Sequence, residues 1–326
     1  MRLIMHKSTK KILLYYVLAP LGFVVLLYLI YRQVTASKDL PEQWERLKNS
    51  LSAQNIKWFV LVLLIAPTNW CLEALKWKKL LTPLQRVSFA RAFKSMLSGM
   101  SFSLVTPNRV GDFAGRIIHV PSGQRIKAAV ASMIGSIAQM CATATFGLIG
   151  LLYINISQCN KFTQIAMAVA IVIATGVVFI FFNLRRVQGF SKKRPLLRKL
   201  NFGLRVLSFY SKKDLGWLLL LSFGRFLCYN LQFLLLINIL GAAVPLFPGI
   251  CVSALMFWVI AVVPSVAIME LGVRGFVGVY LFVDLLHISE QPLAVLSGSY
   301  LLWFINLVIP AILGSFTLLG LARPRD

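Results

Sequence analysis

Long uninterrupted apolar runs dominate this chain and constrain its fold more than any other feature. A run of about 18 or more apolar residues is long enough to cross a bilayer as a helix. Such runs recur along the 326 residues, and the mean hydropathy of the whole chain is +0.78. Only 13% of the residues are charged, too few to cover a water-soluble protein of this length. The sequence therefore predicts an all-α polytopic membrane protein with a single membrane domain over residues 1–326.

The apolar runs divide into full spans and interrupted regions. We expect about six full transmembrane helices, over residues 12–31, 57–75, 126–153, 162–183, 215–240 and 292–321. The first follows a basic start and resembles a signal peptide, but its length favours an uncleaved helix. Two further apolar regions, 88–117 and 246–288, are each interrupted by a cluster of proline, glycine and charged residues.

Basic residues gather in the gaps between these runs. Lys and Arg together number 34 against 10 Asp and Glu, and they concentrate in the gaps 1–11, 76–94 and 185–213. Positively charged loops usually stay in the cytoplasm and are attracted to anionic lipids. We therefore expect both termini and the basic loop 185–213 in the cytoplasm, and no nucleic-acid partner.

The loop assignment predicts an internal repeat. If each full span crosses once, the region 88–125 begins and ends in the cytoplasm and the region 246–291 begins and ends outside. Each region is then a re-entrant helical hairpin. Repeat 1, about 12–153, and repeat 2, about 162–321, have the same order of elements in inverted orientation. Transporters often use this plan, with the substrate site near the membrane midplane at the helix breaks.

Both hairpins carry the same short pattern, a proline followed by an acid and then by an arginine four positions after the acid, with a glycine beside the acid. In repeat 1 these residues are Pro107, Gly111, Asp112 and Arg116. In repeat 2 they are Pro264, Gly272, Glu270 and Arg274. The repetition indicates equivalent sites in the two halves.

A helix broken inside a bilayer leaves backbone groups that need partners in protein or in a wet cavity. A new helix that begins near Gly111 or Leu271 would present the positive end of its dipole, which attracts phosphate. Arg109, Arg116 and Arg274 add guanidinium groups, which suit bidentate recognition of phosphate. The pattern predicts a site for an anionic, phosphate-bearing head group.

The two acids allow more than one interpretation. Asp112 and Glu270 could cap their helices, orient the arginines or meet a cationic head group. Alternatively, Asp112 with Arg116 and Glu270 with Arg274 are intrahelical ion pairs that only hold the hairpins together.

Arg225 is a further candidate because of its depth. It follows Lys213 by 12 residues, which places it close to the midplane, where charged groups usually serve function. The alternative is a buried ion pair with Glu270 or Glu73. We expect Glu73 and Asn69 themselves at the membrane interface instead of at the site.

Metal, cofactor and catalytic patterns are absent from the sequence. The five cysteines have no C-x-x-C spacing and the three histidines are far apart, so we expect neither a metal nor a cofactor. The motifs of serine hydrolases, zinc proteases and P-loop enzymes are missing as well. We expect a protein that is not an enzyme, although an intramembrane lipid-modifying enzyme with scattered acids and arginines stays open.

The sequence resembles the lysylphosphatidylglycerol synthase transmembrane-region family, often called flippase-like proteins. "TPNRVGDFAGR" at 106–116 is similar to the family motif T-P-G-R-x-G-[DE], and "ELGVRG" at 270–275 is similar to P-x-G-G-L-G-V-R-E. The matching positions are Pro107, Arg109, Gly111, Asp112, Leu271, Gly272, Val273 and Arg274. The departures from the two motifs are Asn108, Met269, Glu270 and Gly275.

The resemblance implies lipid translocation in the cytoplasmic (inner) membrane of a bacterium. Well-understood relatives are fused to a soluble aminoacyl-transferase domain and move an aminoacylated phospholipid, and the resemblance here does not extend to such a domain. We therefore expect a flippase-like translocase whose partners are membrane lipids, either phospholipids, glycolipids or polyprenyl-linked lipids. The alternative is a non-transporting membrane partner of an envelope glycosyltransferase or lipid-modifying enzyme.

Overall fold

The computed structural model describes residues 40–50, 55–106, 109–157, 161–183, 205–263 and 267–322, with isolated positions 28, 31, 32, 35 and 186. Throughout these residues the secondary structure is helical and no strand occurs. Within the described ranges, five helical segments are long and apolar enough to cross a membrane. The prediction of an all-α polytopic membrane protein is confirmed.

Five of the predicted spans correspond to long helices. They are α4 (Ile56–Leu81), α7 (Arg125–Ser157), α8 (Lys161–Phe182), α11 (Lys212–Ile239), and a last span made of α14 (Pro292–Trp303), a π-helical stretch (Phe304–Val308) and α15 (Ile309–Ala322). The predicted span 12–31 lies outside the described residues apart from positions 28 and 31.

Both interrupted regions form two helices with a break between them. The first contains α5 (Phe89–Val105) and α6 (Gly111–Ile117), and the second contains α12 (Leu246–Val262) and α13 (Ala267–Val279), which continues into a π-helical stretch (Tyr280–Leu285). Three residues predicted at the breaks, Pro107, Asn108 and Pro264, lie outside the described residues. Shorter helices are α3 (Leu40–Asn49), Ser122–Gln124 and Arg205–Phe209.

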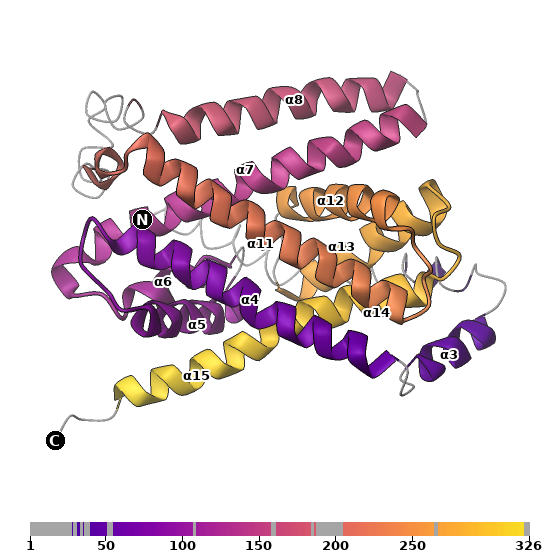
Figure 1. Ribbon diagram of the computed structural model, residues 1–326, viewed down its shortest axis with the longest axis horizontal. Helices are drawn as coiled ribbons and strands as arrows, with labels where there is room; N and C mark the ends of the chain where they lie inside the picture. Colours follow the sequence, from indigo (N-terminus) through magenta and orange to yellow (C-terminus); the bar gives the residue numbers. More distant parts are fainter. Residues whose placement is uncertain are drawn as a thin grey trace, which may run out of the picture.

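The helices of the two halves pack reciprocally around the central pair α4 and α11. Figure 1 shows α4 and α11 lying side by side through the middle of the molecule, with α7 and α8 running alongside each other. α5 packs against α15, and α12 packs against α7. Each interrupted region thus rests on the last span of the other half of the chain.

Glycines allow this close approach. Gly150 of α7 lies against the carbonyl of Cys251 on α12, and Gly314 of α15 lies against the carbonyl of Leu97 on α5, with no room for a Cβ at either glycine. Small residues let membrane helices approach until their backbones touch. The same device therefore holds both interrupted regions in place.

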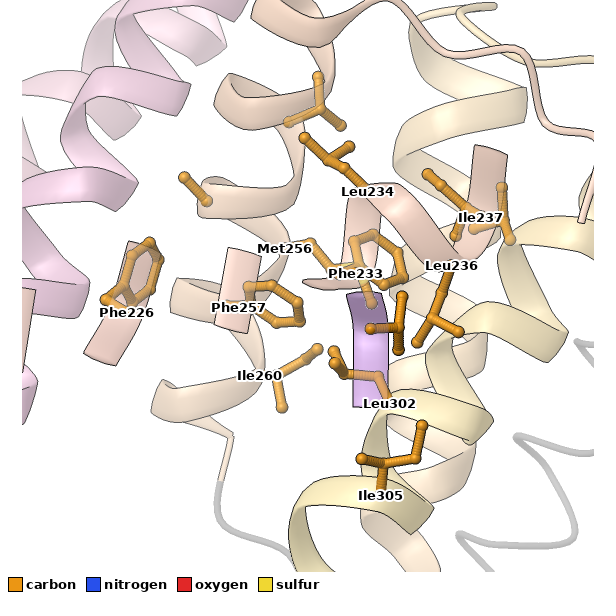
Figure 2. Close-up of a cluster of buried hydrophobic side chains, with 14 of the residues drawn as sticks. Phe226, Phe233, Leu234, Leu236, Ile237, Met256, Phe257, Ile260, Leu302 and Ile305 are labelled. Carbon is orange, nitrogen blue, oxygen red and sulfur yellow. The ribbon is translucent and has the colours of Figure 1, made fainter. Parts of the chain in front are cut away.

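Aromatic and aliphatic side chains fill the space between α11, α12 and the last span. Phe233 and Phe257 pack edge to face with ring centroids 5.4 Å apart, and Met256 lies beside them (Figure 2). By contrast, α8 leaves most of its apolar side chains exposed, with Val172 71% accessible. An apolar face of this kind suits lipid as its neighbour.

Candidate functional site

The break between α5 and α6 is shaped by local hydrogen bonding and by one unusual backbone conformation. Arg109 has a φ of 55°, in the left-handed region that non-glycine residues rarely adopt. The Gly111 N–H donates to Thr106 Oγ1 at 2.8 Å, and Gly111 lies against the carbonyl of Phe102. The expectation that this N–H is free to bind an anion is therefore wrong, because the threonine hydroxyl already accepts it.

The second break lies earlier in the sequence than expected. α13 begins at Ala267 instead of near Leu271, so Glu270, Gly272 and Arg274 all lie inside a continuous helix. The assignment of Gly272 to the break is wrong. The chain is interrupted before Ala267, and α13 then continues through Gly272 to Val279, so this glycine does not stop the helix.

Glu73, on α4, is the centre of a buried ion-pair network. Its carboxylate lies 2.7 Å from the Lys76 ammonium, 2.8 Å from the Arg116 guanidinium and 2.7 Å from the Arg225 guanidinium. Arg116 also pairs with Asp112 at 2.9 Å. We call these five residues the Glu73 cluster. It joins α4, α6 and α11 through charged groups.

The expectation that Glu73 and Asn69 lie at the membrane interface is wrong. Only 4% of Glu73 and 3% of Asn69 are accessible. A buried carboxylate is tolerated when cations surround it. Here Lys76 lies one turn further along α4, and Arg116 and Arg225 come from two other helices. The sequence signal was weak, because Arg116 and Arg225 lie far from Glu73 along the chain.

A chain of side-chain amides extends from this cluster to the last span. Arg225 Nε donates to Asn69 Oδ1 at 3.1 Å, and Asn69 Nδ2 donates to Asn306 Oδ1 at 2.8 Å. Asn306 Nδ2 donates to Gln232 Oε1 at 2.7 Å, and Gln232 Nε2 donates to the carbonyl of Val62 at 2.9 Å. Asn306 lies in the π-helical stretch of the last span, a geometry often found at functional sites.

A second charged group connects the two interrupted regions. It consists of Glu270, Arg109 and Arg274, and we call it the Glu270 cluster. One Glu270 carboxylate oxygen accepts from Arg109 Nη2 at 2.6 Å and from Arg274 Nη2 at 2.7 Å. Arg274 Nη1 also donates to the Tyr229 hydroxyl at 2.9 Å. Arg274 is buried, whereas the Arg109 side chain is 46% accessible. The contact between Arg109 and Glu270 joins residues that lie 161 positions apart in the chain.

Both clusters border one cavity of about 490 Å³, the central cavity. Its polar lining comes from both halves of the chain: Asn69, Arg109, Gln139, Thr143, Arg225, Tyr229, Glu270, Arg274, Trp303 and Asn306. Its apolar lining is Met100, Phe226, Phe257, Ile260, Ala261, Val262, Val263 and Leu307. The cavity therefore combines guanidinium groups with an apolar wall.

The predicted site residues divide into two groups. Arg109, Arg225, Glu270 and Arg274 line the central cavity. Asp112 and Arg116 are not part of its lining as the described residues define it; Arg116 contacts Glu73 instead, and Asp112 contacts Arg116. Both intrahelical acid–arginine pairs are present, and Arg225 takes Glu73 as its partner. Gln139 and Tyr229, which the sequence did not indicate, complete the polar wall.

The site offers donors for an anion more readily than ligands for a metal. Within the described ranges, no group of three or more His, Cys, Asp or Glu residues is placed to hold a metal ion. The carboxylates of Glu73, Asp112 and Glu270 all contact basic side chains. Guanidinium groups in a partly apolar cavity are suited to bind phosphate or carboxylate oxygens.

Comparison with known proteins identifies the family. The model of the lysylphosphatidylglycerol synthase transmembrane region matches residues 12–314 of the chain. Searches of curated proteins and of solved structures gave no match. The family match covers nearly the whole chain, including both helix breaks and every residue of the two clusters. The chain therefore belongs to the lysylphosphatidylglycerol synthase transmembrane-region family, a lipid-related family of membrane proteins.

Proposed function

We propose that this protein binds the phosphate-bearing head group of an anionic membrane lipid in the central cavity and moves the lipid between leaflets. One observation carries the proposal. Arg109, Arg225 and Arg274, from three separate elements, border the same cavity beside an apolar wall. The cavity thus offers donors for a phosphate and an apolar surface for the part of the lipid next to it.

The energetic cost of these arginines supports a binding role. Charged groups inside a membrane protein are expensive and usually face a cavity that serves transport or binding. Arginine holds its charge at any accessible pH and presents a planar fork of donors that matches two phosphate oxygens. A site that bordered lipid only passively would need none of the three.

Within this proposal Glu270 occupies the place of the lipid phosphate when the site is empty. Its carboxylate holds Arg109 and Arg274 together, and an incoming phosphate would replace it on the more exposed Arg109. Arg225 faces the cavity from α11 and lowers the electrostatic barrier for the moving phosphate. Arg116, which Asp112 holds in place, fixes Glu73, and Glu73 in turn orients Arg225.

We further propose that the two halves act as inverted repeats, about 12–153 and 162–321, each with one re-entrant hairpin. The reciprocal packing of α5 on α15 and of α12 on α7 supports this arrangement, as do the paired glycine contacts. Rocking of one half against the other would then expose the cavity to each side in turn. The basic loops favour cytoplasmic termini in the inner membrane of a bacterium.

Lipid transfer between leaflets of reconstituted vesicles tests the function. The purified protein is placed in vesicles that contain a fluorescent anionic phospholipid, and a membrane-impermeant quencher reports the fraction in the outer leaflet over time. We expect the wild type to speed the exchange and an Arg109→Gln/Arg274→Gln double variant to abolish it. Exposed Lys78, on α4 but outside both clusters, provides a matched Lys78→Gln control.

The same vesicles distinguish the alternatives. Mass spectrometry should recover the lipid chemically unchanged, since we propose transport without reaction. A chemically altered lipid would support an intramembrane enzyme instead. Wild-type vesicles that transfer no anionic lipid would contradict the proposed function and favour a membrane partner of an envelope enzyme.

A further inference from the structure

The charges around the central cavity do not balance, and the imbalance bears on which lipid the site accepts. The following inference rests on the proposed function and concerns the charge of the lipid head group. The ion pairs of the two clusters support it, and most of the side chains in these pairs are buried.

The Glu73 cluster has more cations than carboxylates. Lys76, Arg116 and Arg225 provide three positive charges, whereas Glu73 and Asp112 provide two negative charges. Among the described residues, one positive charge of this cluster is therefore left over. Of the three cations, Arg225 borders the cavity and has the most accessible side chain, at 24%.

The Glu270 cluster repeats this imbalance on another part of the cavity wall. Arg109 and Arg274 share a single carboxylate, that of Glu270, and both bind the same oxygen of it. The Tyr229 hydroxyl gives Arg274 a neutral acceptor only. This cluster, too, is left with one positive charge.

Unpaired donors border the same cavity. Arg274 Nε and Trp303 Nε1 are buried, and neither has a hydrogen-bond acceptor among the described residues. Both residues line the central cavity. A buried N–H without an acceptor destabilises a structure. Together with the surplus charge, these donors indicate that an oxygen-rich anion belongs at this site.

From this balance we infer that the site selects a lipid whose head group carries two negative charges, a terminal phosphomonoester or a diphosphate diester. One dianionic group between the two clusters would neutralise the surplus of both. A phosphodiester, with one negative charge, would neutralise half of it. An aminoacylated phospholipid has a cationic amino group, which the arginines would repel.

The apolar wall favours a lipid over free phosphate. Phe226 and Phe257 line the cavity, and Val262, at the end of α12, is 65% accessible. Burying an acyl or prenyl segment against these side chains adds affinity that inorganic phosphate lacks. The expected ligand therefore joins a dianionic phosphate directly to an apolar chain.

Binding to the intact protein in detergent tests the inference. Native mass spectrometry or a titration of intrinsic tryptophan fluorescence compares phosphatidic acid, phosphatidylglycerol, lysylphosphatidylglycerol and inorganic phosphate. We expect phosphatidic acid to bind about tenfold or more tightly than phosphatidylglycerol at pH 8, since one further charge interacts with the surplus. Lysylphosphatidylglycerol and inorganic phosphate should both bind more weakly than phosphatidylglycerol.

A pH series separates charge from head-group size. The second ionisation of a phosphomonoester lies near pH 6, so its affinity should rise from pH 5.5 to pH 8. Phosphatidylglycerol keeps one charge over this range and should show a much smaller change. Parallel curves for the two lipids would overturn the inference.

Two substitutions that change the charge balance in opposite directions distinguish an effect of charge from an effect of misfolding. Lys76→Met removes one positive charge without altering the cavity lining, and should weaken phosphatidic acid binding about tenfold. Asp112→Asn removes one negative charge and should strengthen that binding severalfold. Lys78→Met is the matched control and should change nothing. General damage to the fold would weaken binding in both cluster variants, and that pattern would contradict the inference.

The outcomes also separate this inference from the proposed function. Equal affinity for both anionic lipids, or tightest binding of lysylphosphatidylglycerol, would overturn the dianion preference and leave lipid binding intact. Tightest binding of inorganic phosphate would overturn the assignment to a lipid. Absence of binding by every probe would contradict the inference and the proposed function together.

Discussion

Arg225 of α11 donates to Glu73 of α4 at 2.7 Å, and this contact joins two helices that lie side by side through the middle of the molecule. The two residues lie 152 positions apart in the chain. Arg225 borders the central cavity, whereas Glu73 lies behind it among buried cations. The pair therefore connects the cavity wall to the network that supports it.

Replacing Glu73 by Gln should strongly destabilise the protein. The substitution leaves Lys76, Arg116 and Arg225 with one carboxylate fewer, and removing one partner of a buried ion pair typically costs about 3–5 kcal/mol. Thermal unfolding in detergent should show a clear fall in Tm. The exposed ion pair between Glu42 and Arg46 supplies the control, because Glu42→Gln should leave Tm almost unchanged. Equal Tm values for the two variants would contradict the role of the Glu73 cluster.

Replacing Arg109 by Gln should abolish lipid transfer while preserving the fold. Arg109 is about half exposed, and Glu270 retains its contact with Arg274 when Arg109 is removed. We expect transfer in vesicles to fall about tenfold or more, since one charge-assisted contact to the phosphate is lost. Tm should change little. A large loss of Tm with normal transfer would assign Arg109 a structural role instead.

Adding a methyl group at Gly150 should disturb the packing of α7 on α12. A Cβ at this position would meet the carbonyl of Cys251, so the helices must separate, at a cost of about 1–3 kcal/mol. Gly176, on α8, has open space around it, and Gly176→Ala should keep or slightly raise Tm because alanine favours helix. Gly150→Ala and Gly176→Ala can be compared by thermal unfolding. Equal tolerance would contradict the close contact.

Acidification should weaken the contact between His119 and α5. His119 Nε2 lies 2.8 Å from Ser98 Oγ, which also contacts Thr317. Burial lowers the pKa of His119 below its ordinary value of 6.5, and the charges of Lys94 and Arg91 lower that pKa further. The folded state thus prefers the neutral ring, so its contribution to stability is complete above about pH 6.5 and declines as pH falls toward the lowered pKa.

A His119→Gln variant checks this pH dependence. Gln can contact the Ser98 hydroxyl and does not titrate. Between pH 7.5 and pH 5.5, Tm of the wild type should therefore fall more than Tm of the variant. Identical pH profiles would show that His119 does not contribute.

The helical elements were predictable because their signal is local. Apolar runs long enough to cross a membrane identified α4, α7, α8, α11 and the last span within a few residues at most ends. Proline, glycine and charge interrupted the other two apolar regions, and each contains two helices. Length and hydropathy sufficed, because backbone groups in a bilayer must satisfy each other within a helix.

The exact break positions and the ion-pair partners were less accessible from the sequence. Gly272 looked like a break residue but lies inside α13, because glycine by itself does not end a helix that packing supports. Glu73 looked interfacial, since its partners Arg116 and Arg225 are distant in the chain and meet it only in three dimensions. Arg225 was identified as a site candidate from its expected depth alone. The choice between Glu73 and Glu270 as its partner could not be made, because both acids are distant from Arg225 in the chain.

The lipids that co-purify with the protein test the central claim most directly. Mass spectrometry compares the lipids bound to the wild type with those bound to an Arg109→Ala/Arg274→Ala double variant, both extracted in the same detergent. The account predicts that one phosphate-bearing lipid is enriched on the wild type and lost from the variant. Identical and unselective lipid profiles would contradict it and would reduce both arginines to structural ion pairs.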